Sequence, residues 1–431
     1  MAERNLSDGP KLPTAFADTY IAPKSAPPSP PSLATRTTVT PASAATAAAA
    51  AAAAAAGVRS TVLPRVEHGA GAPRLVLEGK PRYQPVRHLG SGGQAEVTLA
   101  RDHDIDRAVA VKRLLPDRSD DAAVLRFAEE IRTVGQLEHP NIVPIHDVGV
   151  DEKGQYFFIM KYVEGETLES IIAKLRGGEE AYLRRYTPEH RLQICNEILR
   201  GVEHAHELGI LHRDLKPANI MVGSLGEVVI MDWGLAKRVG EPEAAARDAA
   251  AAPHDERARM FETQAGALIG TPAYMAPEQA AGQLDAIDAR SDVYSLALMF
   301  YEFLSLKHPR SHCTSVAEMV AATIDEPIEF TTLVADFSRA GAPAALAHFV
   351  RHGLERDPAK RYPSVTAMRE RLERVRDGRA PIQCHVTLTQ RALDAAARSA
   401  NRHPFILGGI LAAMAVGIVG GAAALVLALV R

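Results

Sequence analysis

The sequence holds little cysteine and almost no net charge, and both shortages exclude classes of protein. Its three cysteines, Cys195, Cys313 and Cys384, lie far apart without a CxxC pair, which predicts reduced thiols rather than disulfides or a zinc site. A formal net charge of −3 offers no basic surface for a nucleic acid, so no partner of that class is expected. The first residues also lack the charged start, apolar core and cleavage site of a signal peptide.

Large apolar side chains are scarce in the first 82 residues. This region is rich in proline, alanine, serine and threonine, and it contains ten consecutive alanines from Ala47 to Ala56. Such a composition offers too little apolar surface to offset the entropy that is lost on folding. Residues 1–82 are therefore predicted to form a disordered tail.

Charged and strongly polar side chains are absent from residues 405–430. As a helix these 26 residues would be about 39 Å long at ~1.5 Å per residue, which exceeds the roughly 30 Å hydrocarbon core of a bilayer. A buried core helix is the alternative, although such helices are shorter and usually carry a polar face. We expect a transmembrane helix after a linker, 377–404, whose arginines place the preceding chain in the cytoplasm.

Residues 83–376 show the alternating and helical periodicities of a folded domain. Strands are predicted at 83–89, 95–101, 107–114, 145–150 and 155–163, with one helix among them at 120–137. Most later segments are helical, most clearly 187–209, 288–305 and 344–355. The expected fold class is α+β, with a small, mostly β lobe followed by a larger, mostly α lobe and a ligand site between them.

Glycines separate the first two predicted strands. The stretch HLGSGGQAEVTLA, residues 88–100, places Gly90, Gly92 and Gly93 in a hairpin, where backbone N–H groups can approach phosphate oxygens without interference from a Cβ. A dinucleotide-binding fold is not favoured, because it requires a helix directly after its glycines. A plain glycine hairpin is the remaining alternative.

A lysine lies on the next predicted strand. In AVAVKRL, Lys112 shares one strand face with Ala108 and Ala110, which leaves space for a flat ligand beside its ammonium. On the following helix Glu129 falls opposite the apolar stripe and Glu130 at its edge, so Glu130 is expected to turn towards Lys112. For each charge taken singly, a solvated surface position is the alternative.

Two polar stretches follow in the helical half. GILHRDLKPANIMV, residues 209–222, brings Asp214, Lys216 and Asn219 into one loop, and VVIMDWGLAK, residues 228–237, places Asp232 beside the only tryptophan. A carboxylate can accept the proton of a substrate hydroxyl, and a lysine can neutralise a phosphate in transit. An amide oxygen and a second carboxylate suit Mg²⁺. Taken alone, Asp232 could be an ordinary turn residue close to a glycine.

The order of these motifs resembles that of the eukaryotic-like (Hanks-type) serine/threonine protein kinases. The glycine-rich loop, AVAVK, the helix glutamate, HRDLKPAN, DWG, GTPAYMAPEQ and SDVYSLA follow one another as in that family, over residues 83–376. The resemblance implies the two-lobed protein kinase fold. The tail and the apolar span are similar to those of bacterial membrane-bound members, which implies the inner membrane as the location.

The resemblance also implies catalytic and metal-binding roles. Asp214 would orient the acceptor hydroxyl and take its proton, and Lys216 would steady the transferred phosphoryl group. Asn219 and Asp232 would bind Mg²⁺. Trp233 stands where the family usually has phenylalanine, and it would keep an aromatic plug at this position.

ATP would be held by the lysine and by the glycine-rich loop. Lys112 would bind the α- and β-phosphates while paired with Glu130, and Leu89 and Val97 would pack on the adenine. Ala95 replaces the third glycine of the family pattern, a change of one methyl group. The residues assigned to the loop over the phosphates are Leu89, Gly90, Ser91, Gly92, Gly93, Gln94, Ala95, Glu96 and Val97.

The segment between DWG and GTPAY is expected to regulate the enzyme. In kinases with an arginine before the catalytic aspartate, here Arg213, that arginine pairs with a phosphate on this segment. Thr263 carries the only hydroxyl side chain between Asp232 and Gly270, so it is the candidate autophosphorylation site. The alternative is that acidic residues such as Glu262 already supply the charge. Glu278 is expected to be held by Arg361 in a purely structural pair.

The expected acceptors are serine and threonine hydroxyls of proteins, because GTPAYMAPE resembles the segment that forms a peptide-binding surface in kinases. Two other readings stay open: a membrane-tethered pseudokinase scaffold, and a small-molecule phosphotransferase with the same fold. The pseudokinase lacks support because none of the key polar residues is missing. Small residues at every fourth position of the apolar span would also permit a homodimer: Gly409, Ala413, Gly417 and Gly421.

Overall fold

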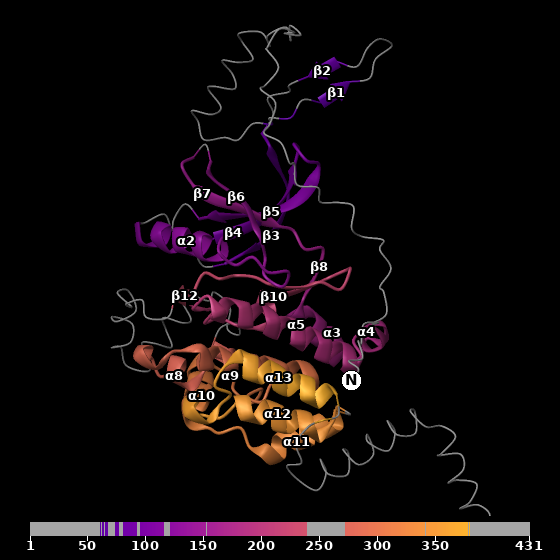
Figure 1. Ribbon diagram of the computed structural model, residues 1–431, viewed down its shortest axis with the longest axis vertical. Helices are drawn as coiled ribbons and strands as arrows, with labels where there is room; N and C mark the ends of the chain where they lie inside the picture. The colour runs from indigo at the N-terminus through magenta and orange to yellow at the C-terminus, as the bar shows by residue number, and fades with distance from the viewer. Residues whose placement is uncertain are drawn as a thin grey trace, which may run out of the picture. The chain divides into compact units, whose positions relative to one another are not determined.

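The computed structural model describes residues 61, 63, 65–67, 74–76, 81–92, 95–115, 121–151, 153–238, 272–340, 342–377 and 379. In Figure 1 a β-sheet with one helix, coloured indigo to magenta, precedes a helical half that is coloured magenta to yellow. The arrangement is the expected α+β fold with two lobes. Gly93, Gln94, Thr263 and the predicted 405–430 span lie outside the described residues.

The N-terminal lobe is built on an antiparallel sheet with the strand order β3-β4-β5-β7-β6. All five strands were expected from alternation of apolar residues, and two of them have the predicted bounds. On β5, Val109 and Val111 pack with Ile159 on one face, whereas Ala110 belongs to the main core on the other. The strands are β3 Tyr83–Ser91, β4 Ala95–Asp102, β5 Arg107–Leu114, β6 Ile145–Val150 and β7 Tyr156–Lys161.

Helix α2, Asp121–Val134, packs its apolar stripe on this sheet. The ring centroids of Phe127 and Phe158 lie 5.3 Å apart. The helix is shorter than the predicted 120–137, since the chain turns at Gly135, whose N–H donates to the carbonyl of Ile131 at 2.9 Å. Glu129 is exposed and Glu130 is buried, as the helical periodicity predicts.

Residues 141–143, after α2, bind the two lobes together. Asn141 accepts a hydrogen bond from the N–H of Ile230 at 2.8 Å through its carbonyl, and the N–H of Val143 donates to the carbonyl of Ile230 at 3.1 Å. The amide side chain of Asn141 donates to the carbonyl of Val228 at 2.8 Å. The strand β11, which leads to Asp232, is therefore fixed to residues 141–143.

The C-terminal lobe is mostly helical, and the predicted helices 187–209, 288–305 and 344–355 are confirmed as α5, α9 and α12. Its α-helices are α3 Leu168–Arg176, α4 Glu180–Arg185, α5 Pro188–Glu207, α8 Pro277–Ala280, α9 Ala289–Ser305, α10 Val316–Asp325, α11 Phe330–Arg339, α12 Ala344–Gly353 and α13 Val365–Arg376. Its short strands are β8 Gly165–Thr167, β9 Ile210–Leu211, β10 Ile220–Gly223, β11 Val228–Ile230 and β12 Lys237–Arg238. Its 3-10 turns are η2 Pro217–Asn219, η3 Pro272–Tyr274, η4 Leu284–Ala286 and η5 Pro358–Lys360.

Helix α9 forms the centre of this lobe, because every residue from Ser291 to Leu304 is buried. A helix that is apolar on nearly all sides must be surrounded by other elements. The helix begins at Asp288, whose carboxylate accepts the N–H of Arg290 at 2.8 Å, and ends at Leu306 in the left-handed conformation. Helices α5, α11, α12 and α13 all contact it. Its position is thus fixed from several directions.

Two short strands lie within residues 1–82, the region that is predicted to form a disordered tail. Strands β1, Arg65–Glu67, and β2, Arg74–Val76, pair antiparallel, with Val66 opposite Leu75. Three-residue strands are too short for alternation to stand out against the surrounding composition, which is why the sequence did not predict them.

None of the helices in the described ranges is long and apolar enough to cross a membrane.

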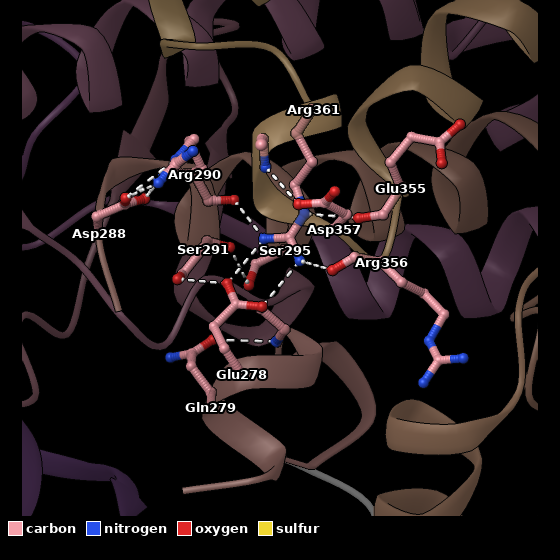
Figure 2. A network of polar contacts seen from close by, with 12 residues as sticks. Glu278, Gln279, Asp288, Arg290, Ser291, Ser295, Glu355, Arg356, Asp357 and Arg361 are labelled. Atoms are coloured by element: carbon pink, nitrogen blue, oxygen red, sulfur yellow. Dashed lines mark hydrogen bonds and ion pairs between the residues drawn. The ribbon is translucent and has the colours of Figure 1, made fainter. Parts of the chain in front are cut away.

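The pair Glu278–Arg361 fixes α8 to the lobe, and Figure 2 shows it as a two-point contact. The guanidinium donates to the two carboxylate oxygens at 2.7 and 2.8 Å, and the hydroxyl of Ser291 donates to the same carboxylate at 2.6 Å. The remaining guanidinium N–H groups donate to the carbonyls of Glu355, Arg290 and Arg356. Because both side chains are buried and saturated with hydrogen bonds, the pair is structural, as expected.

Replacing one partner of this buried pair should destabilise the protein strongly. Arg361→Met leaves the carboxylate of Glu278 buried without its cation, so the free energy of unfolding should fall by about 3–5 kcal/mol. Urea unfolding of both proteins measures the difference. The matched control is Arg184→Met, which breaks an exposed pair with Glu180 and should cost at most about 0.5 kcal/mol. Equal losses in the two variants would contradict the structural role.

Candidate active site

Lys112 lies at the junction of three elements. Its ammonium donates to the carboxylate of Glu130 on α2 at 2.6 Å and to that of Asp232, beyond β11, at 2.9 Å. Burial opposes the charge of Lys112, but the two carboxylates outweigh it, and the pKa of Lys112 is raised. The lysine therefore stays protonated at neutral pH, and it joins the sheet, α2 and the C-terminal lobe.

Asp232 adopts a left-handed backbone conformation, with φ of 59°. This conformation is costly for a residue with a Cβ, so the surroundings must hold it. Trp233 supplies part of that support, since it is 1% exposed and its ring centroid lies 4.5 Å from that of His212. The charge of Lys112 lowers the pKa of Asp232, so the carboxylate is ionised at neutral pH.

The catalytic-loop candidates Asp214, Lys216 and Asn219 converge in the loop that ends in η2. The ammonium of Lys216 donates to the carboxylate of Asp214 at 2.7 Å. The amide nitrogen of Asn219 donates to the carbonyl of Asp214 at 2.8 Å and to its carboxylate at 3.2 Å. Burial raises the pKa of Asp214, against the opposing charge of Lys216. A raised pKa makes the carboxylate a better proton acceptor than an exposed aspartate.

Asn219 and Asp232 provide a donor set that fits Mg²⁺. The N–H of Met231 donates to the carbonyl of Asn219 at 2.8 Å, so Asn219 and Asp232 lie at neighbouring ends of β10 and β11. The amide nitrogen of Asn219 is bound to Asp214, which leaves its oxygen as the atom that can ligate a cation. Within the described ranges no group of three or more His, Cys, Asp or Glu side chains could hold a metal. Two oxygen ligands suit a Mg²⁺ ion that shares its other positions with phosphates and water.

The glycine-rich loop connects β3 and β4. The N–H of Gly92 donates to the carbonyl of Ala95 at 2.8 Å, and a Cβ added at Gly90 would meet no atom within 4 Å. Ala95 is 6% exposed and belongs to the core, so its methyl group is enclosed by the lobe. Leu89 is exposed, and Val97 packs against the main core.

Asp292, on α9, is the aspartate of the SDVYSLA motif, and the sequence alone assigned it no role. Its carboxylate accepts the backbone N–H groups of His212 and Arg213, each at 2.9 Å. His206 on α5 contacts the same carboxylate through Nε2 at 2.8 Å. Burial works against its charge, but these donors outweigh it and the pKa of Asp292 is lowered. The available signal was an aspartate inside an otherwise apolar helical run, which usually means a buried acceptor.

Arg213 needs this anchor because its φ is 66°, in the left-handed region. Its N–H is held by Asp292 and its carbonyl accepts the side-chain amide of Gln279 at 3.0 Å. The N–H of the next residue, Asp214, is directed to Nδ1 of His212 at 3.3 Å. The backbone in front of Asp214 is thus fixed by side chains from α8 and α9 and by His212 of the loop itself.

Asp292→Asn should destabilise the protein by about 3 kcal/mol at pH 7, because an amide replaces a charged acceptor of three donors. Since the native pKa of Asp292 is lowered, its stabilisation is present above the usual aspartate pKa and is lost as the pH falls through the native value. The difference in the free energy of unfolding between wild type and Asp292→Asn should therefore shrink as the pH falls. Urea unfolding between pH 7 and 3 measures it.

The matched control is Asp285→Asn, at an exposed aspartate of η4, which makes the same change of charge. Its stability difference from wild type should be small at every pH. A difference for Asp292→Asn that stays constant down to pH 3 would show that the carboxylate charge is not what holds the loop.

Comparisons with known proteins agree with this arrangement. The family model of the protein kinase domain matches residues 83–372. The chain is 35% identical over 312 residues to the serine/threonine-protein kinase PknD of Protochlamydia amoebophila, which covers 71% of this chain and 31% of that protein. It is 34% identical over 304 residues to PknB of Mycobacterium tuberculosis, covering 70% and 44%.

A third relative is the probable serine/threonine-protein kinase SCO3848 of Streptomyces coelicolor, 34% identical over 306 residues, with 70% of this chain and 41% of the relative covered. The matched part thus spans less than half the length of each of these relatives. The described residues contain the paired lysine, the loop aspartate and the neighbouring asparagine and aspartate in the order of this family. The chain belongs to the protein kinase family, among the Hanks-type serine/threonine kinases of bacteria.

Proposed function

We propose that the protein transfers the γ-phosphoryl group of ATP to serine and threonine hydroxyls of proteins. The observation that carries this proposal is the three-way contact of Lys112 with Glu130 and Asp232. It requires α2 to lie against the sheet and the DWG turn to face the lysine, which is the arrangement that phosphoryl transfer by kinases needs. The named relatives support the same activity for this chain.

ATP binding follows from the positions of Lys112 and the glycine-rich loop. The ammonium of Lys112 is held between two carboxylates and can turn towards the α- and β-phosphates. Backbone N–H groups of the glycine-rich loop would cover the phosphates, and Leu89 and Val97 would contact the adenine. Asn219 and Asp232 would hold Mg²⁺, which neutralises phosphate charge when it is bound.

The acceptor hydroxyl is activated at Asp214. Its carboxylate lies in the loop beside Lys216, and burial raises its pKa towards the range in which a base accepts a proton readily. Lys216 contacts Asp214 at 2.7 Å and can move to the phosphoryl oxygens as charge builds there. The residues after Gly270 form the surface that receives the acceptor peptide.

A pseudokinase scaffold is the less favoured alternative. Pseudokinases usually lack one or more of the ion-pair, base and metal residues, whereas here Lys112 and Glu130 are in contact and Asp214, Asn219 and Asp232 are present. The presence of all these residues therefore favours catalysis.

We further propose regulation by autophosphorylation at Thr263. The support is the sequence alone: Thr263 is the only hydroxyl residue between Asp232 and Gly270, and Arg213 precedes the catalytic aspartate. A phosphate on this segment would pair with a guanidinium and order the chain around it. Residue 263 lies outside the described ranges.

Transfer of labelled phosphate from ATP and Mg²⁺ tests the activity. The wild-type chain should label itself and a protein acceptor, and Asp214→Asn should lower the rate by a factor of about 100 to 10,000, the usual contribution of a general base. Mass spectrometry should locate the phosphate at Thr263, and Thr263→Ala should lose the activation that accompanies labelling. Nucleotide binding without transfer by the wild type would support the scaffold instead.

We also propose that residues 405–430 anchor the kinase in the inner membrane of a bacterium, with the domain in the cytoplasm, and that their small residues allow a homodimer. The full chain should remain with membranes after an alkaline carbonate wash, and a chain that ends at residue 404 should not. Crosslinking of the full chain in membranes should weaken in Gly417→Leu, because leucine blocks close helix approach. Release of the full chain by the wash would reject the anchor.

A further inference from the structure

The side chain of Gln279 connects α8 to the catalytic loop that carries Asp214. Helix α8 lies at the end of the stretch from DWG to APE, which is called the activation segment below. Gln279 is the third residue of α8, Pro277–Ala280, and Figure 2 shows it next to Glu278. Its side-chain oxygen accepts the N–H of Ala276 at 3.0 Å, and its side-chain nitrogen donates to the carbonyl of Arg213 at 3.0 Å. One amide therefore connects two backbone segments that are 63 residues apart in the chain, 276 minus 213.

The carbonyl that Gln279 holds belongs to the peptide bond between Arg213 and Asp214. The N–H at the other end of that peptide bond is directed to Nδ1 of His212 at 3.3 Å. Arg213 itself is in the left-handed region, with φ of 66°, a conformation that is strained for a residue with a Cβ and persists only where neighbours hold it. Rotation of this peptide plane would move Asp214, because Asp214 supplies its nitrogen.

Gln279 is held at a defined position by the residue before it. Glu278 is 4% exposed and is bound by Arg361 and Ser291, so α8 cannot shift without breaking that network. Arg213 is thus attached through its N–H to Asp292 on α9 and through its carbonyl to Gln279 on α8. Both attachments lead to the same buried helix.

We propose that Gln279 is a positioning residue for phosphoryl transfer, which makes the placement of Asp214 depend on the peptide-binding end of the activation segment. The amide of Gln279 can accept from Ala276 and donate to Arg213 at once. A carboxylate accepts but cannot donate, and a thioether of the same length makes neither bond well. The inference rests on the proposed kinase function.

Gln279→Met should lower kcat about tenfold and leave KM for ATP and for a peptide within about twofold, since the interaction acts on the reacting aspartate rather than on binding. Gln279→Glu should be similarly slow, because the carboxylate can accept the N–H of Ala276 but has no proton to donate to the carbonyl of Arg213. The control is Gln283→Glu, at an exposed glutamine, which makes the same change of charge and should keep the wild-type kcat.

Amide hydrogen exchange measures how firmly the catalytic loop is held, and it does not require kinase activity. The amides of residues 212–214 should exchange faster in Gln279→Met than in wild type, and amides of α9 should not change. A Met variant with wild-type kcat, or with unchanged exchange at 212–214, would overturn the inference, as would a Glu variant with wild-type kcat. Absence of transfer by the wild type would instead reject the kinase function, and the exchange comparison would still decide the role of Gln279.

Discussion

The carboxylate of Asp292 is the interaction on which the active site depends. It lies within α9, which is buried along almost its whole length, and it accepts hydrogen bonds from the loop backbone at His212 and Arg213. Burying a charge is costly unless donors surround it, and the loop must therefore come to the carboxylate for either to be stable. In this loop Arg213 adopts a left-handed conformation directly before Asp214. A core helix thus positions the loop that carries Asp214.

A second set of charges joins the lobes at Lys112. Two carboxylates and one ammonium meet within 2.9 Å, and they come from α2 and from the turn after β11. The set has one negative charge in excess, which suits a site that is to receive a divalent cation. Residues 141–143, which follow α2, are also hydrogen-bonded to Ile230, just before the DWG turn. These bonds link the position of the chain after α2 to that of the DWG turn.

The third constraint is the attachment of α8. Arg361 and Ser291 hold Glu278, and Gln279 reaches from α8 to the carbonyl of Arg213. The structural pair and the catalytic loop therefore share one small helix. Such an arrangement lets a buried ion pair far from the chemistry contribute to catalysis by fixing the frame in which Asp214 lies.

The sequence by itself determined the secondary structure of the domain and the identity of most polar residues at the site. Alternation predicted β5 and β6 with their observed bounds, and the helical period placed Glu130 rather than Glu129 towards Lys112, because both patterns depend on local geometry alone. The order of the motifs gave the family, and with it the pair of Glu278 and Arg361, which are 83 residues apart.

The tertiary structure alone decided the roles of Asp292 and Gln279. Asp292 in SDVYSLA and Gln279 in GTPAYMAPEQ help to mark the family, but the motifs do not say what these side chains contact. Their partners become defined only when the catalytic loop packs against them, since His212 lies 80 residues before Asp292 and Arg213 lies 66 before Gln279. The left-handed conformations of Arg213 and Asp232 are likewise imposed from outside, because their local preferences oppose them. The strands β1 and β2 were not predicted for a different reason, since three residues are too few for a periodic signal. Contacts between distant segments carry energies that no local pattern records, and these contacts place the catalytic loop.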